Sequence, residues 1–203
     1  MFGTNGLTCM CNHYRNAPEL IPTWREYAGF DIRQPNVEFA SDVYPKRPGM
    51  IVRRDDGAVR SDVMLWGVPT MVKGATKMLE KRVTNVRNLA SPFWKSMLAS
   101  PPQRCLVPFS TFAEPKAGQG RQEWWFSIPD QPLAAFAGIW RNTEHGPCYA
   151  FLTCEPNQLV EPLHPKAMPV VLEPAQYGEW LSTDYSGACA MARPFPADRM
   201  SVE

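Results

Sequence analysis

Three reactive side chains lie on turns beside proline or asparagine, and together they supply a thiol, a carboxylate and an imidazole. They are Cys11, Glu114 (followed by Pro115) and His164 (followed by Pro165). A thiol attacks a carbonyl carbon when a nearby base takes its proton, and carboxyl and imidazole groups serve as such bases. Each residue type also has an ordinary structural use, as a buried cysteine, a solvated glutamate or a capping histidine. The residue types alone therefore leave a nucleophilic site and three unrelated residues both open.

Motifs for several other chemistries are missing from the chain. It has no glycine-rich phosphate loop, no GxSxG and no HExxH sequence. Cys9-Met10-Cys11 with His13 is the nearest approach to a metal site, but there is no CxxC pair and the chain has three histidines. Because structural zinc sites need four such ligands, we expect no metal and no cofactor.

The amino-terminal sequence and the cysteines indicate a reducing compartment. The first ten residues, MFGTNGLTCM, lack the basic start and long apolar stretch of a secretory signal. The six cysteines are therefore expected to be free thiols in a cytoplasmic protein, most of them small buried residues. No run approaches 18 apolar residues, so no membrane-spanning helix is predicted.

Charge is distributed unevenly along a chain whose net charge is +1. Residues 1–104 contain 15 basic and 9 acidic side chains, whereas residues 105–203 contain 6 and 11. The stretch from Lys73 to Arg104 has seven basic side chains against Glu80 alone. Such a stretch is typical either of a polyanion-binding face or of an ordinary solvated face.

A chain of 203 residues suits one domain. Because 21 of its residues are proline, we expect the candidate residues to be positioned by short helices and strands. Helices are predicted from the capping box at Thr23 to Gly29, from Ser91-Pro92 onward, and over Pro174–Leu181. Strands are predicted over Met50–Arg53, Val63–Val68, Cys105–Pro108, Glu123–Ile128, Leu133–Trp140 and Cys148–Cys154. Most strands follow one another without a crossover helix, which favours an antiparallel α+β domain. The tail after Ser182 is expected to be irregular.

The order of several separated segments resembles the SRAP family, the SOS response-associated peptidases that shield abasic sites. These segments are Met10–Arg15, Leu65–Pro69, Asn85–Asn88, Arg104–Glu114 and His164–Pro169. The resemblance implies a single domain over residues 11–182, built from a mainly antiparallel, barrel-like twisted sheet with a few short flanking helices. Residues 1–10 would be a leader or a wrongly assigned start, and residues 183–203 a tail.

Matched motif by motif, the resemblance implies four catalytic residues: Cys11, Asn85, Glu114 and His164. Five residues would contact DNA, namely Arg87, Arg15, Trp66, Pro69 and Lys166. Trp66 and Pro69 would form an apolar wedge or a stacking platform for bases, with a core position as the alternative for Trp66. The chain departs from the usual Met-Cys-Gly-Arg start, since Asn12 and His13 follow Cys11 and Arg15 would replace the usual arginine.

The implied activity is covalent capture of abasic sites in single-stranded DNA. An amino-terminal cysteine would bond the ring-opened aldehyde through both its amine and its sulfur, giving a thiazolidine-type linkage. The leader blocks this amine until it is removed, and a self-cleaving peptidase or a lyase activity would fit the same site. A thiol peptidase or amidase acting on other proteins, and a non-catalytic single-strand binder, are the alternatives. We expect a cytoplasmic, nucleoid-associated monomer.

Overall fold

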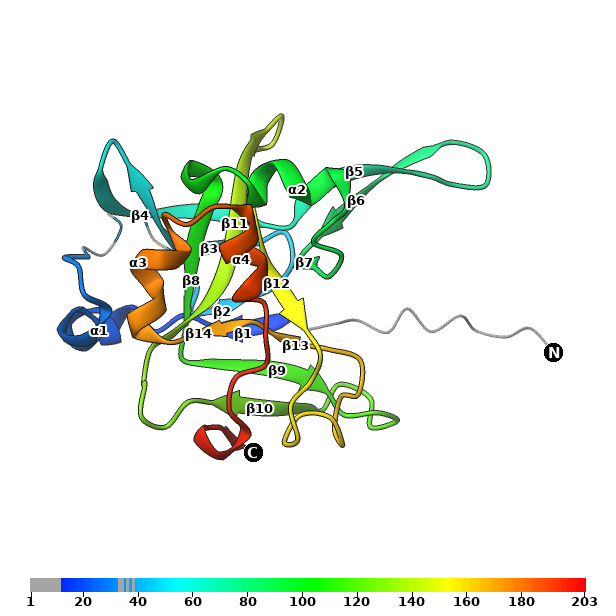
Figure 1. The fold of residues 1–203 in the computed structure, drawn as a ribbon. Coiled ribbons are helices and arrows are strands. Elements are labelled where there is room, and N and C mark those ends of the chain that lie inside the picture. The colour runs from blue at the N-terminus through cyan, green and yellow to red at the C-terminus, as the bar shows by residue number, and fades with distance from the viewer. Residues whose placement is uncertain (1–11, 33–34, 36, 38) are drawn as a thin grey trace.

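Five strands close into a barrel at the centre of the molecule (Figure 1). In this computed structural model, which describes residues 12–32, 35, 37 and 39–203, they are β3 (Pro48–Asp55), β4 (Ala58–Trp66), β8 (Arg104–Phe109), β11 (Ala134–Thr143) and β12 (Gly146–Cys154). The order β12, β4, β3, β8, β11 returns to β12 because β11 and β12 pair with each other as a hairpin. The β12–β4 pairing is parallel, and the other four are antiparallel.

Buried apolar runs explain why these segments become barrel strands. All six residues of β8 and the first six of β11 are buried, so both faces of each strand are covered. Four aromatic rings, those of Tyr14, Trp66, Phe136 and Phe151, pack together inside, with neighbouring centroids 4.6–6.1 Å apart. Large rings on some strands and small residues on β11 fill the narrow interior, as a small barrel requires.

A second, antiparallel sheet lies against one side of the barrel, below it in Figure 1. Its strands, in spatial order, are β15 (Ser201–Val202), β10 (Glu123–Ser127), β9 (Thr111–Pro115), β1 (His13–Arg15) and β2 (Asp42–Val43). Phe112 on β9 stacks on Phe126 of β10 at 5.0 Å and meets Phe136 of the barrel at 5.8 Å. The apolar contact between Phe112 and Phe136 joins the two sheets.

Three short strands pair with the barrel strands β11 and β12. They are β7 (Asn85–Val86), parallel to β12, β13 (Met168–Pro169), antiparallel to β12, and β14 (Val171–Leu172), antiparallel to β11. The hairpin of β5 (Val68–Lys73) and β6 (Met78–Val83) projects away from the body of the molecule, as Figure 1 shows.

The helices are short and flank the sheets. They are α1 (Ile21–Ala28), α2 (Pro92–Leu98), α3 (Tyr177–Trp180) and α4 (Tyr185–Ala190), with 3-10 turns at Pro18–Leu20, Pro101–Gln103, Pro174–Gln176 and Ala197–Arg199. Helix α2 begins after Ser91 as predicted, and α1 ends before Gly29, whose φ of 80° suits glycine. Helix α1 starts before Thr23, because Pro22 occupies its first turn, where a missing N–H costs nothing. No helix in the described ranges is long and apolar enough to cross a membrane.

Two predictions about the elements were wrong. The strand expected over Val63–Val68 is divided between β4 and β5, because the chain turns at Gly67 with a φ of 112°. The C-terminal segment is ordered rather than irregular. Asp184 caps α4 through the Gly187 N–H at 2.8 Å, and β15 pairs with β10. The predicted α+β class with a barrel-like sheet is confirmed.

Substitution of Gly138 tests the packing of the barrel wall. A methyl group at Gly138 would lie 2.7 Å from Cys105 Sγ and 2.8 Å from a Val107 methyl, both inside the fold. We expect Gly138→Ala to lower the free energy of unfolding by about 1–3 kcal/mol, because overpacking forces neighbours out of place. Gly178→Ala is the matched control, since nothing lies within 4 Å of its added methyl. Urea denaturation measures both, and equal stabilities would contradict this account of the wall.

Candidate active site

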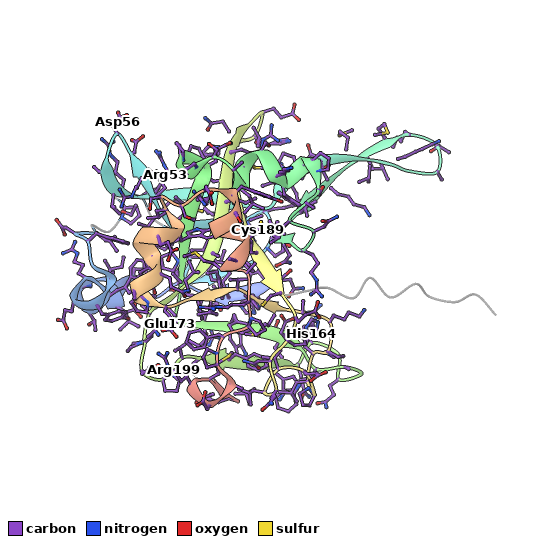
Figure 2. The ribbon with its side chains drawn as sticks, in the orientation of Figure 1. Arg53, Asp56, His164, Glu173, Cys189 and Arg199 are labelled. Atoms are coloured by element: carbon purple, nitrogen blue, oxygen red, sulfur yellow. The ribbon has the colours of Figure 1, made fainter. Side chains whose placement is uncertain are left out.

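A buried carboxyl and a buried imidazole face each other between the barrel and the second sheet. Glu114 on β9 is 1% exposed, and His164, in the segment before β13, is 8% exposed. Glu114 Oε2 lies 3.7 Å from His164 Nε2. Figure 2 shows His164 at the level where the barrel meets the second sheet. The fold thus brings together two of the predicted catalytic residues that are 50 positions apart.

The hydrogen bond at the other ring nitrogen sets the tautomer of His164. Its Nδ1 lies 2.8 Å from the Ala167 carbonyl oxygen, which can only accept, so Nδ1 carries a hydrogen. In the neutral ring, Nε2 therefore presents a lone pair toward the carboxyl of Glu114. At 3.7 Å the two atoms are further apart than in a direct hydrogen bond, and a single donor placed beside the pair could reach both of them. This geometry suits proton transfer to and from a bound group.

Asn85 is on β7, which pairs with β12. Asn85 is opposite Phe151 in the parallel β7–β12 pairing, and it is 7% exposed. Its side-chain nitrogen donates to Thr84 Oγ1 at 2.9 Å. Strand β12 also pairs with β13, so β12 connects the strand of Asn85 to the segment that contains His164.

Arg87 braces the segment that contains His164. Its guanidinium donates to the carbonyl oxygens of Cys154 at 3.1 Å and Lys166 at 2.8 Å, and to the Glu155 carboxylate at 2.6 Å. The side chain is 37% exposed, so part of it faces solvent. Lys166 thus contributes its backbone to this bracing, and its own side chain is on the exposed surface. Arg87 therefore stabilises this segment through its hydrogen bonds and also presents a positive charge to solvent.

His13, near the beginning of the described chain, links β1 to β2 and, across β9, to β10. It is 4% exposed, with Nδ1 2.8 Å from Glu123 on β10 and Nε2 2.9 Å from Asp42 on β2. The ring therefore has a carboxylate partner at each of its two nitrogens. The ring also stacks on Tyr44 at 4.0 Å. Cys11, two residues earlier, and the predicted leader 1–10 lie outside the described residues.

An aromatic and cationic surface follows the same strands. Arg15 donates to Asp42 at 2.9 Å, and its guanidinium carbon lies 3.9 Å above the Trp125 ring. Lys116 sits 3.8 Å above the Trp124 ring. Trp124 and Trp125 are adjacent on β10, so strand alternation sends their rings to opposite faces, and both rings are half-buried.

A cavity of about 430 Å³ opens beside the first described residue of the chain. Asn12, Tyr44, Pro45, Pro115 and Glu123 are among its lining residues. Pro115 directly follows Glu114, and Glu123 is one of the two carboxylates that hold His13. The cavity therefore lies beside Asn12, the residue that follows Cys11 in the sequence, and beside one of the carboxylates that hold His13.

The predicted base-stacking pair is not assembled. Trp66 is fully buried, donates to the Thr84 carbonyl at 3.2 Å and stacks on Phe151 at 5.2 Å, so its ring is part of the core. This corrects its assignment as an exposed platform. Pro69, on β5, is half-buried and lines a separate cavity of about 320 Å³ with Phe93 and Arg141.

The basic stretch 73–104 is also not one continuous face. Arg104 is fully buried and donates to the carbonyl oxygens of Thr183 and Asp184, and burial lowers its pKa. Arg82 binds Glu80 at 3.1 Å. The lysines at 73, 77 and 81 lie on the projecting hairpin and are exposed.

Comparison with known proteins agrees with this architecture. The family model "SOS response associated peptidase (SRAP)" matches residues 10–203. A solved structure from Bordetella bronchiseptica is 23% identical, with a TM-score of 0.74, covering 95% of this chain and 98% of its own. One from Bacteroides thetaiotaomicron is 19% identical, with a TM-score of 0.73 and coverages of 95% and 90%.

A third solved structure, a phage-related protein from Bordetella bronchiseptica, is 22% identical, with a TM-score of 0.66 and coverages of 96% and 93%. At these identities the likeness concerns the fold alone. No curated protein matches the sequence.

The ion pairs at β1 predict a pH-dependent stability. The hydrogen bond from Arg15, aided by His13, holds the pKa of Asp42 below its ordinary value. The stabilisation is therefore present above the unfolded pKa of about 3.9 and is lost as pH falls through the lower folded pKa. Asp42→Asn should lower the Tm by a few degrees at pH 7, and the difference should shrink toward pH 3. Asp56→Asn, at an exposed turn, should leave the Tm unchanged at both pH values.

Proposed function

Because this chain belongs to the SOS response associated peptidase family, which links it to the response to DNA damage and to a peptidase-like activity, we propose that it captures abasic sites in single-stranded DNA covalently. The reacting residue is Cys11 once it has become amino-terminal. The observation that carries the proposal is the buried Glu114–His164 pair, in which a carboxyl oxygen and an imidazole nitrogen lie 3.7 Å apart. The motif positions of Cys11 and Asn85 support it.

The reaction uses both nucleophiles of an amino-terminal cysteine. The α-amine of Cys11 attacks the aldehyde of the opened sugar, and loss of one water gives an imine. The thiol then adds to the imine carbon, and its proton passes to the nitrogen, closing a five-membered thiazolidine. An α-amine has a pKa of about 7.7–8.0, against about 10.4 for lysine, so far more of it is unprotonated at pH 7. No other co-reactant is needed.

Glu114 and His164 move the protons that these steps require. Glu114 takes a proton from the attacking amine and returns it to the leaving hydroxyl. His164 accepts at Nε2 while Nδ1 stays bonded to Ala167, so it assists sugar opening without losing its orientation. Asn85 offers an amide to hold the opened sugar or the amine. Burial of the pair keeps these exchanges away from bulk water.

The DNA backbone is bound by cations around this site. Arg87 and Arg15 are partly exposed, and the exposed Lys166 follows His164 closely in the chain. Phosphate contacts of this kind dominate affinity and weaken with salt. With Trp66 buried, the exposed Tyr44 and the half-buried Trp125 take over the role of stacking unpaired bases.

Removal of residues 1–10 is a second activity of the same site. The family match begins at Met10, directly before Cys11. Attack of the Cys11 thiol on the Met10 carbonyl forms a thioester and frees the Cys11 amine. Hydrolysis of that thioester then restores the thiol and releases a peptide ending in the Met10 carboxylate. Synthesis from Met10 followed by methionine removal gives the same amino terminus.

The amino terminus decides whether the ring can form. We expect the 11–203 form to give an adduct with an abasic single-stranded oligonucleotide that survives SDS, and the intact 1–203 form to give none, because an amide nitrogen cannot form the imine. Mass spectrometry of each protein before and after reaction fixes its amino terminus. Equal rates for the two forms, with Met1 retained, would contradict the α-amine mechanism. Cleavage of unrelated peptides without an adduct would favour the thiol peptidase.

Substitution of Glu114 tests the proton transfers. In the 11–203 form, Glu114→Gln should slow adduct formation by about 10²–10⁴-fold, since glutamine has the same shape but cannot exchange a proton. Glu161→Gln makes the same chemical change at an exposed position and should react like the unchanged protein. Adduct yield against time on SDS gels measures the rate, and Tm values check folding. A Glu114→Gln protein that folds and reacts at full rate would exclude Glu114 from the chemistry.

A further inference from the structure

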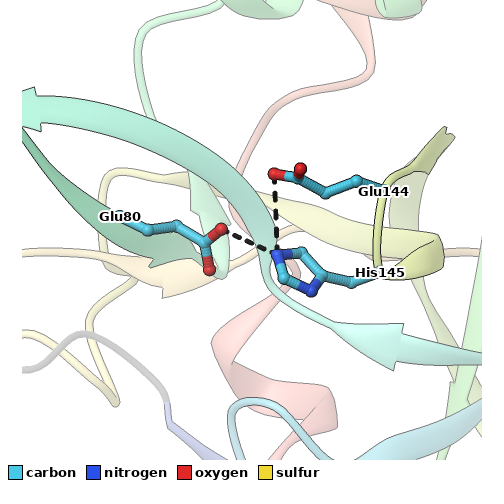
Figure 3. Close-up of side chains that lie close together, drawn as sticks. All are labelled: Glu80, Glu144 and His145. Atoms are coloured by element: carbon cyan, nitrogen blue, oxygen red, sulfur yellow. Dashed lines mark hydrogen bonds and ion pairs between the residues drawn. The ribbon is translucent and has the colours of Figure 1, made fainter.

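Two carboxylates and an imidazole converge where the projecting hairpin meets the β11–β12 turn (Figure 3). Glu80 comes from β6, and Glu144 and His145 come from the turn between β11 and β12. His145 Nε2 lies 2.7 Å from Glu80 Oε2 and 3.7 Å from Glu144 Oε1. One ligand atom from each of the three residues lies within 4.8 Å of the others.

The backbone holds these side chains in place. Thr143 pairs with Gly146 across a two-residue turn, and the positive φ of Gly146, 88°, suits glycine. Thr143 Oγ1 donates to the Gly146 carbonyl at 2.7 Å and accepts from the His145 N–H at 3.1 Å. Glu80 is in a register fixed by its pairing with Met71. The three groups therefore converge from two separately braced hairpins.

The distances are close to those of a metal coordination shell. Zinc binds nitrogen and oxygen ligands at about 2.0–2.2 Å, so neighbouring ligands of a tetrahedral ion stand about 3.3 Å apart. The Glu144 side chain is 78% exposed and has room to rotate, and the Glu80–His145 pair would open from 2.7 Å to reach this spacing. The hydrogen bond from His145 is the main cause of a lowered pKa of Glu80, which keeps that carboxylate ionised. One neighbouring cation, Arg82, occupies Glu80 Oε1 at 3.1 Å and leaves Oε2 facing the imidazole.

We propose that Glu80, Glu144 and His145 bind one divalent transition-metal ion of the zinc class. The imidazole favours zinc over magnesium or calcium, which prefer oxygen ligands alone. Three protein ligands leave the fourth position to water. This site lies apart from the Glu114–His164 pair and does not depend on the proposed function.

A metal ion here would fix the β5–β6 hairpin against the barrel. Glu80 and Glu144 also line the cavity of about 320 Å³ that Pro69, Thr70 and Arg141 border. Coordination would join the two walls of this cavity, which belong to different hairpins. The expected consequence is slower backbone exchange in residues 68–83 when the ion is bound.

Zinc titration of the full 1–203 chain, freed of metal beforehand, tests the site by calorimetry. We expect one ion to bind, with Glu144→Gln and His145→Gln each weakening it about 10-fold or more, since even groups outside the ligand shell have effects of this size. Glu161→Gln should bind like the unchanged chain. Magnesium should give no comparable heat. Hydrogen exchange of residues 68–83 in the unchanged chain should slow on zinc addition and stay unchanged in Glu144→Gln.

Cobalt separates this site from the cysteines near the amino terminus. Cobalt bound to nitrogen and oxygen alone gives weak visible absorption, whereas thiolate ligands add strong near-ultraviolet bands. Zinc binding that is unaffected by both Glu144→Gln and His145→Gln, or cobalt spectra with thiolate bands only, would overturn the proposal. Absence of zinc binding at neutral pH by the folded chain would do the same.

Discussion

Pairing of β11 with β12 closes the barrel, and the other parts of the site depend on that closure. Each ring strand has a partner on both sides, so its backbone groups are satisfied without an exposed edge. Strand β12 then carries β7 and β13 beyond the ring, which brings Asn85 and the segment containing His164 to one end of it. Arg87 ties that segment to the end of β12 at Cys154.

The second sheet depends on the hydrogen bonds of a buried imidazole instead. Both ring nitrogens of His13 are bonded, one to Asp42 and the other to Glu123. A buried polar group without such partners would be costly to the fold. The aromatic rings of Tyr44 and Trp125 pack on the same imidazole. Strand β1, which follows Cys11 in the sequence, is therefore held by the hydrogen bonds of His13 as well as by its strand pairing.

The arginines also show why a local charge count says little about a DNA-binding face. Arg104 joins the barrel to the C-terminal segment, and Arg53 pairs with Asp62 at 2.5 Å and lies 4.7 Å from the Trp140 ring centroid. Arg82 supports the hairpin through Glu80 and the Gly67 carbonyl. These three arginines are bonded to groups of the protein itself. Fewer basic side chains are therefore exposed for phosphate binding than the sequence indicates.

The family, the α+β class and most strands could be predicted from the sequence, because these depend on local composition and on motifs in order. Glu114 and His164 were candidates by residue type, and the family resemblance selected them. That these two face each other, that Trp66 is core, and that the C-terminal segment is ordered by Arg104 and β10 became visible in the tertiary structure. His13 with its carboxylates, and Glu80 with His145, join residues 29 to 110 positions apart. No local pattern encodes such distances, since they arise from barrel closure and strand register.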